Sequence, residues 1–187
     1  MKRKLMSLPN IITLARIGAI PVIIALVLME GATVRWAAFA LFVIAALTDY
    51  VDGHLARKMQ AISPLGRMLD PIADKLLVGA LLVALAYEGA FSLPLLWAAI
   101  AIMMREIAVA GLREFLGARQ ISVHVTPVAK YKTTFQLVAI GIILLVPLIP
   151  ALSLAAAALM WLATALTLYS GYDYFASSWP HLKGTDK

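Results

Sequence analysis

The sequence predicts an all-α integral membrane protein with six transmembrane helices, because of its composition and the length and number of its apolar runs. Of the 187 residues, 63% are hydrophobic and only 14% are charged, too few polar side chains to cover a soluble domain. Apolar stretches recur about every 25 to 30 residues, and each approaches the roughly 20 residues that a helix needs to cross a bilayer core. These runs do not alternate as the strands of a transmembrane barrel would.

The predicted helices follow one another along a single domain, residues 1–187, with short polar connections. The first resembles a secretory signal, but its length, its internal Arg16 and the lack of a small-residue cleavage site favour a retained helix. The second ends and the third begins in the most polar stretch, residues 47–75, and the fourth carries Arg105. The predicted spans are about residues 11–29, 34–52, 69–87, 93–113, 128–147 and 152–173, with a basic juxtamembrane N-terminus at 1–10 and a cytoplasmic tail at 174–187.

Basic residues predict the orientation of these spans. Most basic residues lie at one set of span ends, whereas the loops at the other ends contain only Arg35, beside Glu30 and Glu88. The positive-inside rule therefore places both termini in the cytoplasm. The net charge of +6 then belongs to a cytoplasmic face suited to anionic lipid head groups, and it requires no nucleic-acid partner. The basic residues on this side are Lys2, Arg3, Lys4, Arg57, Lys58, Arg67, Arg119, Lys130, Lys183 and Lys187.

Four aspartates interrupt the apolar pattern near the cytoplasmic ends of the second and third spans. They are Asp49, Asp52, Asp70 and Asp74. Asp49 lies 13 residues from Trp36, and Asp74 lies 13 residues from Tyr87, so each is roughly 20 Å from the outer boundary at 1.5 Å per residue. Antiparallel neighbouring helices would hold both pairs at one depth. Because ionisable residues inside a membrane are costly and usually mark a functional site, we expect a polar cavity open to the cytoplasm.

Within each helix, the spacing places these acids on one face together with small residues. The positions are Asp49, Asp52, Gly53 and Ala56 on one helix and Gly66, Asp70 and Asp74 on the other. Separations of three, four and seven residues return to the same side of a helix. Small residues on that side would allow a bulky ligand to approach closely.

An all-carboxylate cluster of this kind predicts a metal site. Four neighbouring negative charges would repel one another or become protonated unless cations lay between them. The chain has no cysteine, so hard ions such as Mg²⁺ or Mn²⁺ suit the oxygen ligands, and two ions are expected. His54 is interpreted as a lining residue rather than a ligand, because no second histidine stands at ligand spacing. The alternative is that some acids pair only with Arg57, Arg67 or Lys75 at helix ends.

The stretch from Asp49 to Asp74 resembles the signature of the CDP-alcohol phosphotransferase family, D-x-x-D-G-x-x-A-R, eight residues, then G-x-x-x-D-x-x-x-D. The matching residues are Asp49, Asp52, Gly53, Ala56, Arg57, Gly66, Asp70 and Asp74. The resemblance implies an enzyme in which an alcohol displaces CMP from a CDP-linked substrate. It implies that the four aspartates hold the metals and that Asp74 is the base. Asp49, Asp52, Gly53, Ala56, Arg57 and Gly66 would form the CDP site, and the family likeness also suggests a homodimer.

Other stretches resemble the bacterial members of this family that make phosphatidylglycerol phosphate, notably "SLPNIITLARIGAIP", "DPIADK" and "AKYKTTFQ". This likeness implies a multi-pass protein of the bacterial cytoplasmic (inner) membrane that acts in phospholipid biosynthesis on CDP-diacylglycerol and sn-glycerol 3-phosphate. A phosphorylated acceptor requires cationic side chains, for which Arg105, Arg113, Lys130 and Lys132 are candidates. Asn10 and Arg16 are candidates for contact with the lipid head group. For Arg105, a structural ion pair with Glu106 is an equal alternative, and Lys130 and Lys132 equally fit ordinary positive-inside topology.

Three other functions remain open from the sequence. The nearest is another enzyme of the same family that uses phosphatidylglycerol, an inositol phosphate or serine as acceptor. A divalent-cation transporter would also carry intramembrane acids, but the outer halves of the spans are nearly uncharged. A noncatalytic lipid-binding protein would tolerate the loss of Asp74, yet all four acids are present.

Overall fold

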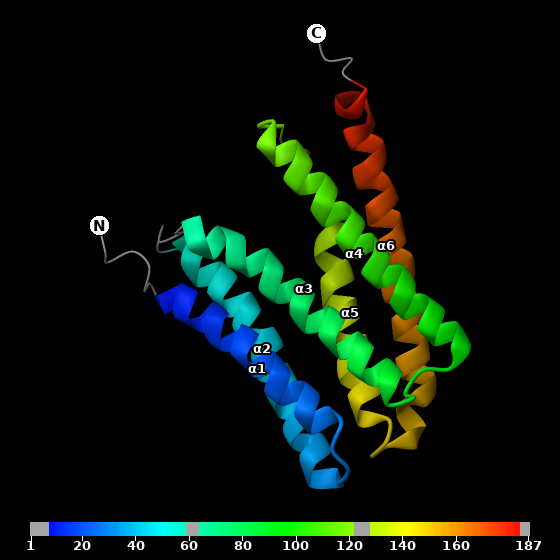
Figure 1. The fold of residues 1–187 in the computed structure, drawn as a ribbon. Coiled ribbons are helices and arrows are strands. Elements are labelled where there is room, and N and C mark those ends of the chain that lie inside the picture. Colours follow the sequence, from blue (N-terminus) through cyan, green and yellow to red (C-terminus); the bar gives the residue numbers. More distant parts are fainter. Residues whose placement is uncertain (1–7, 59–63, 122–127, 184–187) are drawn as a thin grey trace. The chain divides into compact units, whose positions relative to one another are not determined.

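The computed structural model describes residues 8–58, 64–121 and 128–183, and the side chains of residues 10–48, 66, 68–121 and 131–183. All regular structure in these ranges is helical, and the six predicted helices are present (Figure 1). The helices are α1 (Leu8–Val27), α2 (Ala32–Lys58), α3 (Pro64–Tyr87), α4 (Leu93–Ala118), α5 (Val128–Leu145) and α6 (Ser153–Leu182), with a short 3₁₀ helix, η2 (Pro150–Leu152), before the last.

Three of these helices are long and apolar enough to cross a bilayer on their own. The corresponding stretches are Asn10–Val27, Leu93–Ala118 and Pro150–Leu182, and shorter apolar stretches occupy Ala32–Thr48 and Tyr131–Leu145. The first turns of α3 contain Asp70, Asp74 and Lys75, which lower its hydropathy. This composition indicates a membrane-embedded protein, and six complete spans with cytoplasmic termini stay a prediction.

Several helices extend beyond the spans predicted from the apolar runs. Helix α2 continues to Lys58, α3 begins already at Pro64, and α6 has 30 residues and ends at Leu182. A helix of 30 residues is about 45 Å long, more than the roughly 30 Å of a hydrocarbon core. Polar residues end an apolar run without ending a helix, so the spans predicted from apolar runs are shorter than the helices. The first part of the expected tail, residues 174–187, is therefore helical.

Helix α4 ends in a Schellman motif that the sequence does not reveal. Gln120 has a φ of 60°, the left-handed conformation that commonly closes a helix. Its N–H donates to the carbonyl of Gly117, and the N–H of Ile121 donates to the carbonyl of Leu116, each at 3.0 Å. Ile121 also packs against the cluster that contains Leu116. A hydrophobic contact thus accompanies the two hydrogen bonds that satisfy the last carbonyl groups of α4.

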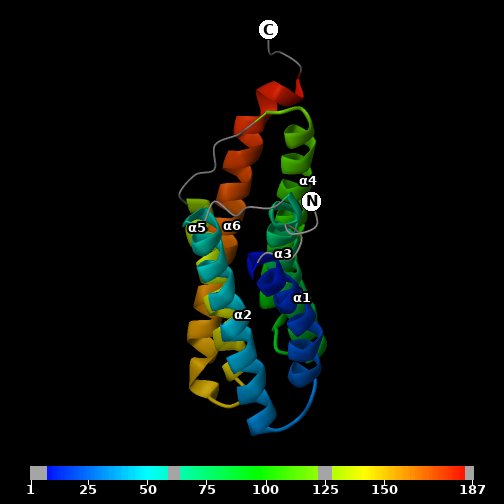
Figure 2. The ribbon, with the colours of Figure 1, turned by 90° about the vertical axis from the view of Figure 1, so that its left-hand side faces the viewer.

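The chain divides into two compact units, of which the first comprises residues 1–90 and 140–153. In this unit α1 packs against both α2 and α3 (Figure 2). The buried residues of α1 recur every three or four positions and include both polar and apolar side chains. They are Asn10, Thr13, Arg16, Ile20, Ile23 and Val27. The face of α1 that meets its neighbours is therefore apolar in one half and polar in the half nearest the N-terminus.

The second unit comprises residues 91–139 and 154–187. Val109, Leu112 and Leu116 of α4 form a buried cluster with Tyr174 of α6. Their spacing along α4 follows the helical repeat, so one stripe of α4 packs against α6. The single domain expected from the sequence stays a prediction.

An ion pair joins the two ends of the α2–α3 hairpin in the first unit. Arg35 Nη1 donates to Glu88 Oε2 at 3.0 Å, and Arg35 Nη2 pairs with Glu88 Oε1. The Arg35 side chain is only 8% exposed. The bidentate pair ties the start of α2 to the end of α3.

Replacing Arg35 by Met is expected to lower the stability of the folded protein in detergent by about 1–3 kcal/mol, because Glu88 would keep a partly buried charge without its partner. Thermal unfolding followed by circular dichroism measures the loss. The double variant R35M/E88M should recover part of it. Equal stability of R35M and the unaltered protein would contradict a stabilising role for this pair.

Candidate active site

Helix α2 presents the first half of the aspartate motif. It is continuous from Ala32 to Lys58, so the helical spacing assumed for Asp49, Asp52, Gly53, Ala56 and Arg57 is confirmed. The side chains of these residues, and of His54, lie outside the described residues. In the preceding turns Ala38, Phe42 and Ala45 are buried. At intervals of three or four residues, positions 49, 52 and 56 continue that same helical face.

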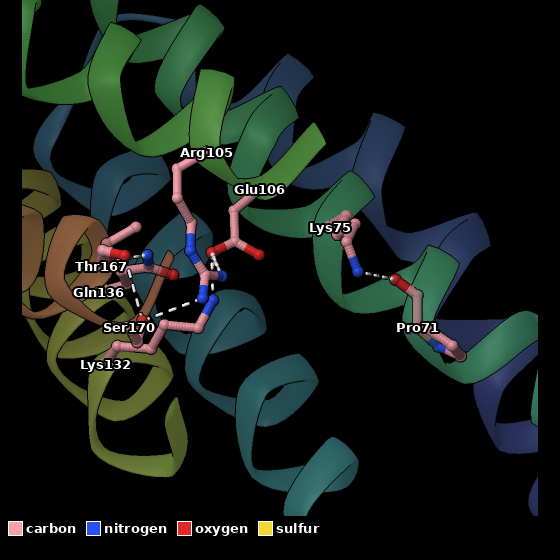
Figure 3. Close-up of polar contacts among 8 residues, drawn as sticks. All are labelled: Pro71, Lys75, Arg105, Glu106, Lys132, Gln136, Thr167 and Ser170. Carbon is pink, nitrogen blue, oxygen red and sulfur yellow. Dashed lines mark hydrogen bonds and ion pairs between the residues drawn. The ribbon is translucent and has the colours of Figure 1, made fainter. Parts of the chain in front are cut away.

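Helix α3 presents the second half of the motif within its first three turns. Gly66 is buried, Asp70 is exposed and Asp74 is partly buried. Intervals of four residues along a continuous helix place all three positions on neighbouring turns of one face. Lys75, one of the alternative ion-pair partners of these acids, donates to the carbonyl of Pro71 at 3.4 Å (Figure 3).

A hydrogen bond connects α1 to one of these acids. Thr13 Oγ1 donates to Asp70 Oδ1 at 3.0 Å, and Thr13 is only 1% exposed. Donation to one carboxylate oxygen restrains the Asp70 side chain and leaves the other oxygen available for a ligand. Sequence reasoning did not single out Thr13 as a site residue. The available signal was its position three residues from both Asn10 and Arg16, which makes a polar face on an otherwise apolar helix.

The donor set of the first unit is compatible with a hard divalent cation. Every carboxylate in the motif offers only oxygen, and Asp70 is held by a neutral hydroxyl, which leaves its charge uncompensated by that contact. Among the residues whose side chains are described, no three His, Cys, Asp or Glu form a group that could hold a metal. Asp49 and Asp52 are not in that set, so the metal centre stays a prediction.

The second unit contains a buried polar cluster that joins α4, α5 and α6 (Figure 3). Arg105 Nη1 donates to Glu106 Oε1 at 3.0 Å, and Lys132 Nζ pairs with the same oxygen. Arg105 Nη2 also donates to Ser170 Oγ at 2.9 Å. The structural ion pair between Arg105 and Glu106 is thus confirmed. Lys132 is only 7% exposed. A lysine that served only the positive-inside topology would extend its ammonium group to water.

Two of the four acceptor candidates, Arg105 and Lys132, therefore meet at one carboxylate. The guanidinium of Arg113, on α4, lies over the ring of Tyr174, 5.7 Å from its centroid. Lys130 lies in α5, and its side chain is outside the described residues. A binding role for any of the four stays a prediction.

Known proteins resemble this chain over almost its whole length. The CDP-alcohol phosphatidyltransferase family model matches residues 6–169. A Rickettsia bellii protein named CDP-diacylglycerol–glycerol-3-phosphate 3-phosphatidyltransferase is 42% identical over 90% of this chain and 93% of its own. A Bacillus subtilis protein of the same name is 39% identical over 95% and 97%. A rice protein named cardiolipin synthase (CMP-forming) is 36% identical over 94% of this chain and 58% of its own. With the aspartate motif complete, this chain belongs to the CDP-alcohol phosphatidyltransferase family.

Proposed function

We propose that this protein transfers the phosphatidyl group of CDP-diacylglycerol to sn-glycerol 3-phosphate, giving phosphatidylglycerol phosphate and CMP. The observation that carries the proposal is similarity over nearly the whole chain to two bacterial proteins named for this reaction. The complete set of four aspartates supports turnover rather than lipid binding alone. A divalent-cation transporter receives no support from these relatives.

The reaction needs one bond to form and one to break at the phosphorus that bears diacylglycerol. The acceptor hydroxyl oxygen attacks this phosphorus, the bond to the CMP oxygen breaks, and CMP leaves with the electron pair. Asp74 accepts the hydroxyl proton as the attack proceeds. Its partly buried position on α3 suits a base that must contact a substrate. Direct displacement requires no covalent intermediate with the protein.

Asp49, Asp52, Asp70 and Asp74 are the proposed ligands of two divalent cations, Mg²⁺ or Mn²⁺. Bound cations of this kind would neutralise the diphosphate and stabilise the departing CMP. The oxygen-only donor set and the fixed carboxylate of Asp70 support this assignment. Gly53, Ala56, Arg57 and Gly66 complete the proposed CDP site together with Asp49 and Asp52.

The substrates differ in where they must bind. CDP-diacylglycerol keeps its acyl chains in the bilayer, and Asn10 and Arg16 are the proposed contacts for its head group. Both are buried on the polar half of the α1 face, so they would contact the head group from inside the unit. Arg105, Arg113, Lys130 and Lys132 are the proposed cations for the acceptor phosphate. Glycerol 3-phosphate would enter from the cytoplasm, with the protein in the bacterial inner membrane and assembled as a homodimer.

Replacing Thr13 by Val is expected to weaken divalent-cation binding by about tenfold, the low end of the effect of removing a group that orients a metal ligand. Val keeps the shape of Thr but cannot donate to Asp70. Binding of Mn²⁺ to the detergent-solubilised protein, followed by electron paramagnetic resonance, measures the change. Thr13→Ser, which keeps the hydroxyl, should bind Mn²⁺ as the unaltered protein does. Equal Mn²⁺ affinity in the Val variant would contradict this role.

The proposed reaction is tested by CMP release from CDP-diacylglycerol in mixed micelles with Mg²⁺ or Mn²⁺. Glycerol 3-phosphate, glycerol, inositol phosphate and phosphatidylglycerol are supplied one at a time. Release that requires glycerol 3-phosphate supports both the reaction and the acceptor. Release with phosphatidylglycerol instead would support the activity named for the rice relative and overturn the acceptor. No release with any of them, by folded protein, would overturn the proposed enzyme.

A further inference from the structure

One carboxylate in the second unit is shared by two buried cations. Glu106 Oε1 accepts from Arg105 Nη1 and from Lys132 Nζ, and these two side chains come from different helices, α4 and α5. The Arg105 and Lys132 side chains are 9% and 8% exposed, and that of Glu106 is 16% exposed. Two cations so close together repel strongly in apolar surroundings. Glu106, which pairs with both, offsets this repulsion.

The α6 side of the cluster fixes the guanidinium of Arg105. Ser170 Oγ donates to the carbonyl of Thr167 at 3.1 Å, so its lone pairs are free to accept from Arg105 Nη2. Gln136 Nε2 donates to Thr167 Oγ1 at 2.7 Å, which adds α5 to the same network. Each contact restricts a donor or acceptor that would otherwise be costly to bury.

A glycine makes room for the stem of Arg105. A Cβ on Gly171 would lie 2.8 Å from Arg105 Cγ, closer than real Cβ atoms come, and 3.0 Å from its Nε, a tight contact. Arg105 therefore follows this path only because position 171 has no side chain. Its Nε is buried and has no hydrogen-bond partner among the described residues. The cluster therefore brings two cationic side chains together and retains a buried donor.

We propose that Glu106 is a positioning residue that holds Arg105 and Lys132 together as a paired cationic receptor for the phosphate of the acceptor. This inference rests on the proposed function and adds a role that acts through the two cations. Two neighbouring cationic donors suit a phosphate anion. Without Glu106, Lys132 would lose the carboxylate that it shares with Arg105 and would turn toward water.

The test is Glu106→Gln, which keeps the size of the side chain and removes its charge. The KM for glycerol 3-phosphate should rise about tenfold or more, as expected for the loss of one charge-assisted hydrogen bond to phosphate. The KM for CDP-diacylglycerol should stay within about twofold, because the cluster is assigned to the acceptor alone. Glu106→Asp should restore part of the acceptor affinity. Glu114→Gln, the same change on an exposed residue of α4, is the matched control and should match the unaltered protein.

A second readout separates this inference from the proposed reaction. Thermal unfolding in detergent is compared with and without glycerol 3-phosphate and with inorganic phosphate. The unaltered protein and Glu114→Gln should be stabilised, and Glu106→Gln should not. This pattern without any CMP release would refute the proposed reaction and leave the receptor in place. The receptor is overturned if the unaltered protein gains no stability from either phosphate compound, or if Glu106→Gln keeps or lowers the KM for glycerol 3-phosphate. It is also overturned if both KM values rise together, as a general structural defect would cause.

Discussion

Replacing Asp74 by Asn is expected to lower the rate of CMP release by about three orders of magnitude, within the range that a general base contributes. The amide keeps the size of the side chain but cannot accept the proton of the attacking hydroxyl. It also removes a negative charge from the proposed metal ligands. The initial rate of CMP release at saturating substrates measures the effect, with thermal unfolding as the check that the variant folds.

Asp173→Asn is the matched control for this variant. Asp173 lies in α6 and is partly buried, as Asp74 is, but it has no place in the proposed site. Its rate of CMP release should equal that of the unaltered protein. A folded Asp74→Asn variant that keeps more than about a tenth of the rate would rule out Asp74 as the base, given that such groups contribute at least about a hundredfold.

Removing divalent cations is expected to abolish CMP release altogether. Without cations, the four carboxylates of the proposed site would repel one another or become protonated, and neither state positions a diphosphate. Chelation followed by measured additions of Mg²⁺ or Mn²⁺ should restore the rate, whereas additions of Na⁺ at equal ionic strength should not. Full activity after exhaustive chelation would contradict the proposed role of all four aspartates.

The existence of the helices could be predicted from the sequence, and their ends could not. The length of an apolar run determines whether a segment can cross a bilayer, and this property is local. The end of α6 at Leu182 and the closure of α4 at Gln120 depend on backbone hydrogen bonds. Gln is not the residue that usually adopts the left-handed conformation, so the motif had no sequence signal.

The same distinction applies to the candidate site. The shared helical face of the acids within α2, and of those within α3, could be predicted. Residues three, four or seven apart lie on one face of a helix whatever the tertiary structure. The bond from Thr13 to Asp70 spans 57 residues and depends on how α1 packs against α3. The meeting of Lys132 with Glu106 depends in the same way on the register of α5 against α4. Sequence spacing within one helix carries no information about such registers.

A competition among acceptors tests most directly which alcohol the protein uses. Purified protein is given CDP-diacylglycerol, a divalent cation and an equimolar mixture of glycerol 3-phosphate, glycerol, inositol phosphate and phosphatidylglycerol, and the lipid products are identified by mass spectrometry. We expect phosphatidylglycerol phosphate as the dominant product, formed in equal amount with CMP. Cardiolipin, phosphatidylglycerol formed directly from glycerol, or an inositol lipid as the dominant product would contradict it.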